Sequence, residues 1–351
     1  CISSAASDVY KRQAIISIEV FELQSTQKGH LFMLFKLIDS SYINEITFIS
    51  IIIAFTATCV IISLCKNILP RDQGRAFAIN GKKSEGKPRG AGIIFVLVFA
   101  ICSFLFIPYS NEMLIYLILV VASMLSGYLD DRANSPWGEY KKAIIDLVLA
   151  VICAITYVNY NGTHIQLFYS DALSFTMPTV PFIILAVVLI WASINVTNCS
   201  DGVDGLCGTL SIISMMTIYG ICQIKGIDAS VKHMILLFAV CLLGYLWFNA
   251  SPSRLLMGDA GSRAIGFFMA IAILKTGSPF LFIPAAIVLI VDGGLGLVKV
   301  FLLRFFKIKI LANTRTPIHD HMRKSKGWSD TQVVFRFSIV QLVVSLALLF
   351  A

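Results

Sequence analysis

The sequence predicts an all-α integral membrane protein, a polytopic helical bundle of about ten transmembrane helices in one domain. The first observation behind this prediction is composition: 57% of the 351 residues are hydrophobic and only 14% are charged, which is too apolar for an ordinary soluble chain. The second is length, because apolar runs near the roughly 20 residues that cross a bilayer recur from Ile46 to the end of the chain. Lipid is therefore expected to surround most of the protein.

Ten apolar runs carry the prediction, and each is recognised by its length and by the polar residues that bound it. The eighth run is short and flanked by glycine, so an alternative count of nine crossings has this helix packed inside the bundle. The expected spans cover residues 45–64, 91–108, 113–129, 144–160, 179–195, 206–223, 233–249, 263–275, 278–303 and 333–351.

Residues 41–351 are expected to form one membrane domain, whereas residues 1–40 are left without a predicted structure. The opening CISSAASDVYKRQ lacks the order of cationic, apolar and small residues that marks a signal peptide. It resembles adapter read-through, so residues 1–13 are excluded from the fold prediction. The nine cysteines show no CxxC spacing, which argues against a disulfide framework and against a zinc site.

Lys and Arg are concentrated in alternate loops, and this pattern predicts the orientation of the bundle. The loop between the first two spans carries seven of them, whereas the next loop, PYSNE, carries none. The first loop is therefore expected in the cytoplasm, and the net charge of +8 is attributed to topology and not to nucleic-acid binding. Continuing the alternation places four polar clusters on the cytoplasmic side: YLDDRAN, NVTNCSDGVDGL, LLMGDAGSR and TPIHDHMRK.

The first two clusters supply acidic and amide side chains. Asp130 and Asp131 end the third span, where an adjacent carboxylate pair is costly unless it meets a cation or water, and where the helix dipole disfavours it. In the second cluster a polar residue stands at every third position, so a regular helix would spread the set around its axis. A helix end with a glycine turn is expected to gather the four at one point, with ordinary helix capping as the alternative. The four residues are Asn195, Asn198, Asp201 and Asp204.

The remaining clusters suggest a metal ion and an anionic ligand. Asp259 stands between glycines in MGDAGS and, together with the other carboxylates, would complete a hard-oxygen site suited to Mg²⁺. His319 and His321 lie in a basic loop that favours an anion, and their spacing does not suggest zinc. Lys87 and Arg89 in KPRGAG are candidate phosphate contacts, with an ordinary positive cytoplasmic loop as the alternative.

In this order and between these spans, the clusters resemble the polyprenyl-phosphate N-acetylhexosamine-1-phosphate transferases from about Ser41 to the end of the chain. Two further stretches, PIHDH followed by KGWSDTQVVFRF and VDGGLGLVKV, resemble the phospho-N-acetylmuramoyl-pentapeptide transferases within that superfamily. Three positions depart from the family pattern. Asn134 replaces a lysine, a His-Asp-His run replaces three histidines, and Leu256 stands where an aromatic residue often stacks on uracil.

The resemblance implies Mg²⁺-dependent transfer of phospho-MurNAc-pentapeptide from UDP-MurNAc-pentapeptide to undecaprenyl phosphate, giving lipid I and UMP in peptidoglycan synthesis. It implies a bacterial cytoplasmic (inner) membrane protein whose catalytic cleft faces the cytoplasm. Asp259 and Asn198 would bind Mg²⁺, while Asp130, assisted by Asp131, would hold or deprotonate the lipid phosphate. The other candidates would bind the nucleotide, sugar or diphosphate: Asn195, Asp201, Asp204, Lys87, Arg89, His319 and His321.

Two alternatives remain open at this stage. The nearest is the same chemistry on UDP-GlcNAc, and the other class is an ion-coupled transporter, which also carries intramembrane carboxylates and broken helices. The expected partners are undecaprenyl phosphate, UDP-MurNAc-pentapeptide and the lipid bilayer, with a homodimer left open and no nucleic acid. The sequence does not decide between direct attack by the lipid phosphate and a covalent intermediate on an enzyme carboxylate.

Overall fold

The computed structural model describes residues 43–74, 84–108, 110–133, 135, 137–169 and 171–350. The segment 1–40, the departure at Asn134 and part of the first basic loop lie outside the described residues. The helices are α2 (Ile43–Cys65), α4 (Gly92–Phe106), α5 (Asn111–Arg132), α6 (Glu139–Asn161), α7 (Thr179–Cys199), α8 (Leu206–Ile224), α9 (Ala229–Asn249), α10 (Gly258–Lys275), α11 (Phe282–Ala285), α12 (Ile287–Leu289), α13 (Leu295–Phe301), α14 (Ile318–Lys326) and α15 (Asp330–Leu349).

Short elements complete the described chain. Strands β1 (His164–Gln166) and β2 (Ser174–Thr176) form an antiparallel hairpin between α6 and α7, with Ile165 opposite Phe175. The remaining elements are the 3-10 turns η3 (Asp171–Leu173) and η4 (Pro279–Leu281) and the π-helical turns η5 (Ile290–Gly294) and η6 (Leu302–Phe306).

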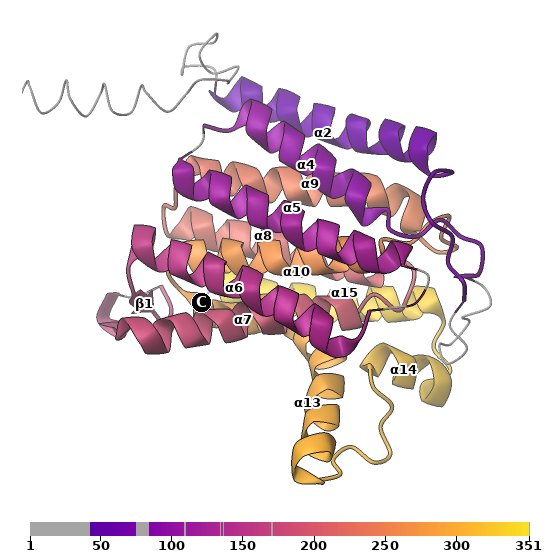
Figure 1. The fold of residues 1–351 in the computed structure, drawn as a ribbon. Coiled ribbons are helices and arrows are strands. Elements are labelled where there is room, and N and C mark those ends of the chain that lie inside the picture. Colours follow the sequence, from indigo (N-terminus) through magenta and orange to yellow (C-terminus); the bar gives the residue numbers. More distant parts are fainter. Residues whose placement is uncertain are drawn as a thin grey trace, which may run out of the picture.

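The predicted class, a polytopic helical membrane protein, is confirmed. Long helices run side by side through the bundle (Figure 1), and each of the ten predicted spans falls on helical residues. Among the described residues, seven helices are long and apolar enough to cross a membrane, or eight if one bent pair is a single span. The count of ten crossings stays a prediction, because α4 is shorter than a full span and α10 carries several charged residues.

Helix α10 lies inside the bundle, which is where the alternative prediction for the eighth span places it. Every residue from Gly258 to Leu274 is buried, and the helix packs mainly against α5 and α7. A Cβ atom on Gly127 of α5 would lie 2.3 Å from the carbonyl oxygen of Asp259, so only glycine allows this approach. The close contact places the end of α5, with its paired aspartates, directly beside the start of α10.

The ninth predicted span is not one straight helix. The segments on either side of Ala286 are bent by 75°, and α13 leaves the side of the bundle (Figure 1). The side chain of Gln341 on α15 is fully buried at the break, where its amide nitrogen donates to the carbonyl oxygens of Pro284 and Ala285, both at 3.1 Å. Its amide oxygen accepts from the backbone nitrogen of Val288 at 3.0 Å. One side chain thus satisfies backbone groups that a broken helix exposes in an apolar region.

We expect Gln341→Leu to lower the thermal stability of the detergent-solubilised protein. The substitution leaves three backbone groups without their partner, each costing on the order of 1–3 kcal/mol when buried. Val340→Leu is the matched control, because Val340 is the preceding residue and its side chain is exposed on the outer surface of the bundle. Thermal unfolding followed by intrinsic fluorescence checks this, and equal midpoints for the two variants would contradict the assigned role of Gln341.

Candidate active site

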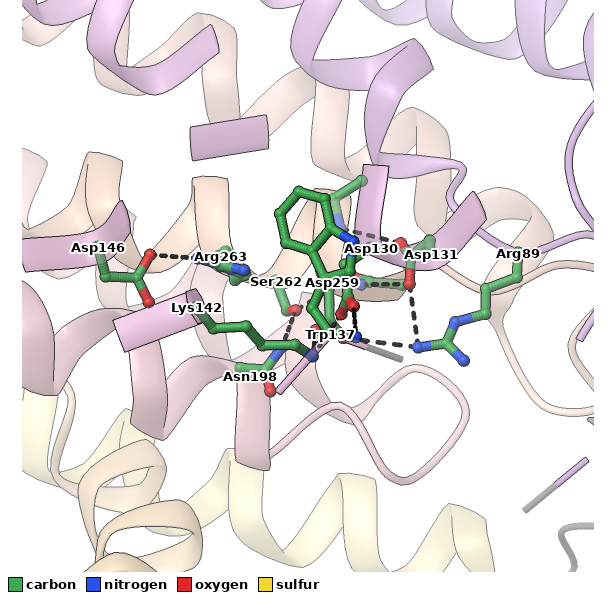
Figure 2. A network of polar contacts seen from close by, with 12 residues as sticks. Arg89, Asp130, Asp131, Trp137, Lys142, Asp146, Asn198, Asp259, Ser262 and Arg263 are labelled. Atoms are coloured by element: carbon green, nitrogen blue, oxygen red, sulfur yellow. Dashed lines mark hydrogen bonds and ion pairs between the residues drawn. The ribbon is translucent and has the colours of Figure 1, made fainter. Parts of the chain in front are cut away.

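Three of the four polar clusters contact one another at the start of α10 (Figure 2), and the fourth lies against the second, where His319 meets Gly202. Asp131 accepts from the backbone nitrogens of Asp259 and Ala260, which joins the first cluster to the third. Asn198 donates to the Ser262 hydroxyl at 2.9 Å, which joins the second cluster to the third. The structure therefore brings together polar residues that stand far apart in the sequence.

Asp131 acts as a cap for helix α10. Its carboxylate accepts from the backbone nitrogen of Asp259 at 3.1 Å and from that of Ala260 at 3.0 Å, and its side chain is fully buried. The positive end of the α10 dipole favours a carboxylate here, which offsets the unfavourable position at the C-terminus of α5. Gly258 has a φ of 68°, and a Cβ atom on it would lie 2.2 Å from a carboxylate oxygen of Asp131. The predicted assisting role of Asp131 at the lipid phosphate has no direct support in these contacts.

Lys142 joins the other two carboxylates. Its ammonium group pairs with Asp130 and lies 3.0 Å from a carboxylate oxygen of Asp259. Asp130 also accepts from the backbone nitrogen of Trp137 at 2.7 Å. Lys142 comes from the first turns of α6 and had no predicted role in the site beyond the positive-inside pattern. A lysine at the start of a helix, next to a basic loop, gives no signal of its own that its side chain turns into the site.

Arg89 bridges carboxylates from three parts of the chain. Its guanidinium lies 3.0 Å from Asp131, 3.5 Å from Asp259 and 3.4 Å from Asp72. Burial lowers the pKa of Arg89, but these carboxylates and nearby Asp201 raise it more, so the group stays charged. Arg89 was predicted as a phosphate contact, and its placement beside the carboxylates is compatible with a ligand that also engages Asp259. Asp72 was not predicted.

The second cluster straddles the end of α7 and the start of α8 as predicted, but its four members do not share one set of contacts. Asn195 donates to the carbonyl oxygen of Trp191 on its own helix. Asp204 accepts from the backbone nitrogen of Ser253 at 2.9 Å and lies 3.7 Å from the ammonium of Lys87. Lys87 in turn donates to the Ser253 hydroxyl. Asp204 and Lys87 therefore contact each other and Ser253, and neither takes part in the contact of Asn198 with α10.

His319 is held by a carboxylate that was not predicted. Asp292, in the π-helical turn η5, accepts from the Nδ1 atom of His319 at 2.8 Å and from its backbone nitrogen at 2.7 Å. The Nε2 atom points to the second cluster, because a Cβ atom on Gly202 would lie 2.4 Å from it. His321 instead accepts from the backbone nitrogen of Arg315 in its own loop. The two histidines therefore differ in environment, and only His319 is fixed beside the second cluster.

We expect His319→Ala to reduce turnover more than His321→Ala does. A hydrogen bond to a charged partner contributes about 1.5–3 kcal/mol, so the loss at His319 should be on the order of tenfold to a hundredfold. Asp292→Asn should reproduce part of the His319 effect, because the imidazole loses the carboxylate that orients it. Initial rates of the three purified variants check this ranking, and a larger loss at His321 would contradict it.

The oxygen donors of the site fit Mg²⁺ if substrate completes its shell. Within the described part of the chain, no three His, Cys, Asp or Glu side chains are grouped to hold an ion, since cations and backbone nitrogens surround the carboxylates. Asp259 keeps 12% of its side chain exposed, and Asn198 uses its amide nitrogen on Ser262, which leaves its amide oxygen for another ligand. Mg²⁺ is commonly bound by one or two carboxylates together with phosphates and waters, so two protein oxygens are sufficient.

Comparison with known proteins identifies the family. The sequence model of glycosyl transferase family 4 matches residues 113–277. The chain is 41% identical over 325 residues to the phospho-N-acetylmuramoyl-pentapeptide-transferase of Treponema pallidum (strain Nichols), covering 86% of this chain and 88% of that protein. The chain belongs to the phospho-N-acetylmuramoyl-pentapeptide-transferase family. Proteins of the same name from Clostridium botulinum (strain Eklund 17B / Type B) and Wolbachia pipientis wMel are 30% and 25% identical, over 75% and 86% of this chain and 81% and 96% of theirs.

Membership of the phospho-N-acetylmuramoyl-pentapeptide-transferase family makes the chain a glycosyl-1-phosphate transferase and a multi-pass membrane protein. The transporter alternative is therefore wrong. The matched region 113–277 runs from α5 to the end of α10 and includes Asp130, Lys142 and Asp259. Arg89 and His319 lie outside that region but within the same site.

Proposed function

We propose that the enzyme transfers phospho-MurNAc-pentapeptide from UDP-MurNAc-pentapeptide to undecaprenyl phosphate, at the cytoplasmic face of the bacterial inner membrane. The single observation that carries this proposal is the set of charges at the start of α10, where Asp130 and Asp259 share Lys142 and Arg89 lies beside Asp259. Such a set suits two phosphate-bearing substrates, because cations neutralise the phosphates and carboxylates can recruit a divalent ion.

In the proposed reaction, an oxygen of the lipid phosphate forms a bond to the sugar-linked phosphorus as the bond from that phosphorus to UMP breaks. The products are lipid I and UMP. Arg89 and Lys142 would reduce the repulsion between the two anionic substrates and stabilise charge on the departing UMP. Mg²⁺, when bound by Asp259 and Asn198, would neutralise the pyrophosphate. Catalysis would then rest on positioning and electrostatics.

Asp130 is a better candidate than Asp131 for contact with the lipid phosphate. Asp131 is fully buried and both its oxygens accept from the backbone of α10, so its loss would first disturb the helix cap. Asp130 is also nearly buried, with 4% of its side chain exposed, but it pairs with Lys142, whose side chain is 29% exposed, so a phosphate that draws Lys142 toward itself would lie close to Asp130.

An apolar cavity of about 280 Å³ supports a polyprenyl substrate. It lies between α7 and the broken helix, and its lining includes Phe182, Leu189 and Phe282. Val196 and Ile290 also line it, and each stands two residues before a polar residue of the site, Asn198 and Asp292 respectively. An isoprenoid chain in this cavity would hold its phosphate end near the charged cluster.

The proposal is tested by UMP release from the purified protein with undecaprenyl phosphate and Mg²⁺, supplying UDP-MurNAc-pentapeptide in one reaction and UDP-GlcNAc in another. Release with the muramyl substrate alone is the expected result. Release with UDP-GlcNAc alone would keep the reaction type and change the pathway. No release with either substrate from folded protein would refute the proposal.

A further inference from the structure

A second pair of charges lies one helical turn beyond the site and was not predicted. Arg263 of α10 forms an ion pair with Asp146 of α6, and 3% and 6% of the two side chains are exposed. Arg263 stands four residues after Asp259 on α10, and Asp146 stands four residues after Lys142 on α6 (Figure 2). The Arg263 pair therefore continues, one turn further along both helices, the line of charges that begins with Lys142 and Asp259.

The two ion pairs run in opposite directions between the same two helices. Lys142 of α6 reaches Asp259 of α10, and Arg263 of α10 reaches Asp146 of α6. Both helices pack against α5 and α7, so the long cationic side chains provide the polar link between α6 and α10. Each cation also has a carboxylate four residues away on its own helix, a spacing at which opposite charges attract. In the structure each cation pairs across to the other helix instead.

Stability alone is a weak explanation for the Arg263 pair. Within the described part of the chain, the Nε and Nη1 atoms of Arg263 have no hydrogen-bond partner although they are buried. A buried ion pair with unsatisfied donors gains little over apolar residues of similar size, because its desolvation offsets the attraction between the charges. The Asp146 carboxylate also interacts electrostatically with both Lys142 and Asp259. The pair is therefore placed to influence which carboxylate Lys142 binds.

We propose that Arg263 and Asp146 are positioning residues that reserve Lys142 for Asp259 and Asp130. Arg263 neutralises Asp146, so this carboxylate does not draw the ammonium of Lys142 away from the site. Asp146 likewise holds Arg263, so the guanidinium does not compete for Asp259 on its own helix. Removal of one partner alone would release the other to form a pair within its own helix, and removal of both would leave Lys142 in place.

The first test measures acylation of the Lys142 amine by a soluble reagent and mass spectrometry, with Lys141 as the internal reference. In Arg263→Leu, Lys142 is drawn toward buried Asp146, so its labelling relative to Lys141 should fall at least about threefold. In Arg263→Leu/Asp146→Leu the ratio should return to the starting value, and in Asp146→Asn it should rise. This test needs neither substrate nor Mg²⁺, so its outcome does not depend on the proposed function.

The second test follows the Mg²⁺ concentration that gives half of the Mg²⁺-induced shift in Tm, and it rests on the proposed function. Arg263→Leu should lower this concentration because Asp259 loses its competing ammonium, whereas Asp146→Asn should raise it. The Arg263→Leu effect acts through Lys142, so it should disappear in a Lys142→Gln background, whereas a direct effect of the removed charge would persist there. The Asp146→Asn effect acts through the freed Arg263, so it should remain in that background.

The possible outcomes distinguish a failure of the inference about Arg263 and Asp146 from a failure of the proposed function. Unchanged Lys142 labelling in both single variants, or a fall that persists in the double variant, would overturn the inference even if UMP is released normally. If Arg263→Leu does not fold, the rise expected in Asp146→Asn and the ratio in the double variant still decide the matter, because apolar replacement of a buried pair is often tolerated. If Lys142 labelling changes as expected but no UMP is released, only the proposed function is refuted.

Discussion

Asp259→Asn should reduce UMP release on the order of a thousandfold, equivalent to about 4 kcal/mol of transition-state stabilisation. The carboxylate of Asp259 contacts both Lys142 and Arg89, and it is the proposed carboxylate ligand of the metal. The amide replacement keeps the shape of the side chain but removes the charge on which all three interactions depend.

The fold should survive this change because a different group stabilises the start of α10. The cap is the Asp131 carboxylate, which binds the backbone nitrogens of Asp259 and Ala260 and does not involve the Asp259 side chain. Asp228→Asn is the matched control. Asp228 caps α9 with its side chain, and asparagine caps helices about as well as aspartate does, so activity should stay within about twofold.

The measurement is the initial rate of UMP release, with the Tm of each variant recorded beside it. A variant of normal Tm that retains more than about a tenth of the rate would contradict the role of Asp259, because loss of a ligand to a catalytic metal costs several kcal/mol. Excess Mg²⁺ should restore little activity, since the amide oxygen binds the ion far more weakly than a carboxylate does.

The fold class could be predicted because the bilayer fixes the length and apolarity of each span. The break at Ala286 could not be located in this way, although Pro284 stands in the same apolar run. Its geometry depends on Gln341, more than fifty residues further along the chain, which satisfies the freed backbone groups. Hydropathy averages over such a run and does not register a single distant amide.

The grouping of Asp130, Asp131 and Asp259 could be predicted, because loop charges place their clusters on one side of the membrane. The different contacts of the adjacent residues Asp130 and Asp131 could not be predicted. Asp130 and Asp131 look equivalent in the sequence, and their contacts differ only because α5 ends against the first turn of α10. Which of two adjacent side chains meets a helix N-terminus depends on helix rotation, and no local pattern encodes it.

Asp292 did carry a usable signal. A carboxylate inside the apolar run LIVDGGLGLV is costly in a membrane unless it has a partner, so it marks a functional position by default. Its partner, His319, was predicted from a separate cluster. Lys142 and Arg263 carried weaker sequence signals than Asp292. The first resembles any lysine beside a positively charged loop, and the second stands where the cluster LLMGDAGSR meets the short eighth span, with no local pattern that indicates a partner on another helix.

Lys142→Gln should have the second largest effect, a loss on the order of a hundredfold or more in the rate of UMP release. Its ammonium pairs with Asp130 and Asp259 together, so glutamine removes the charge that links the proposed lipid-phosphate contact to the proposed metal ligand. Lys141→Gln is the matched control. The adjacent ammonium lies 3.4 Å from the centre of the Trp137 ring and contacts no carboxylate of the site, so activity should stay within about twofold.

The maximal rate and the Mg²⁺ concentration needed for half-maximal activity should both fall in Lys142→Gln. Without the ammonium, Asp259 has one fewer competitor for a divalent ion, so half-maximal activity should need less Mg²⁺ while the maximal rate falls. Damage to the fold would lower the rate without tightening the Mg²⁺ response. A titration of Mg²⁺ at saturating substrate separates these cases, and a weaker Mg²⁺ response would mean that Lys142 supports the metal site and does not compete with it. Because Arg263→Leu should shift the response in the same direction only while Lys142 is present, the two variants together test whether one lysine carries the coupling between α6 and α10.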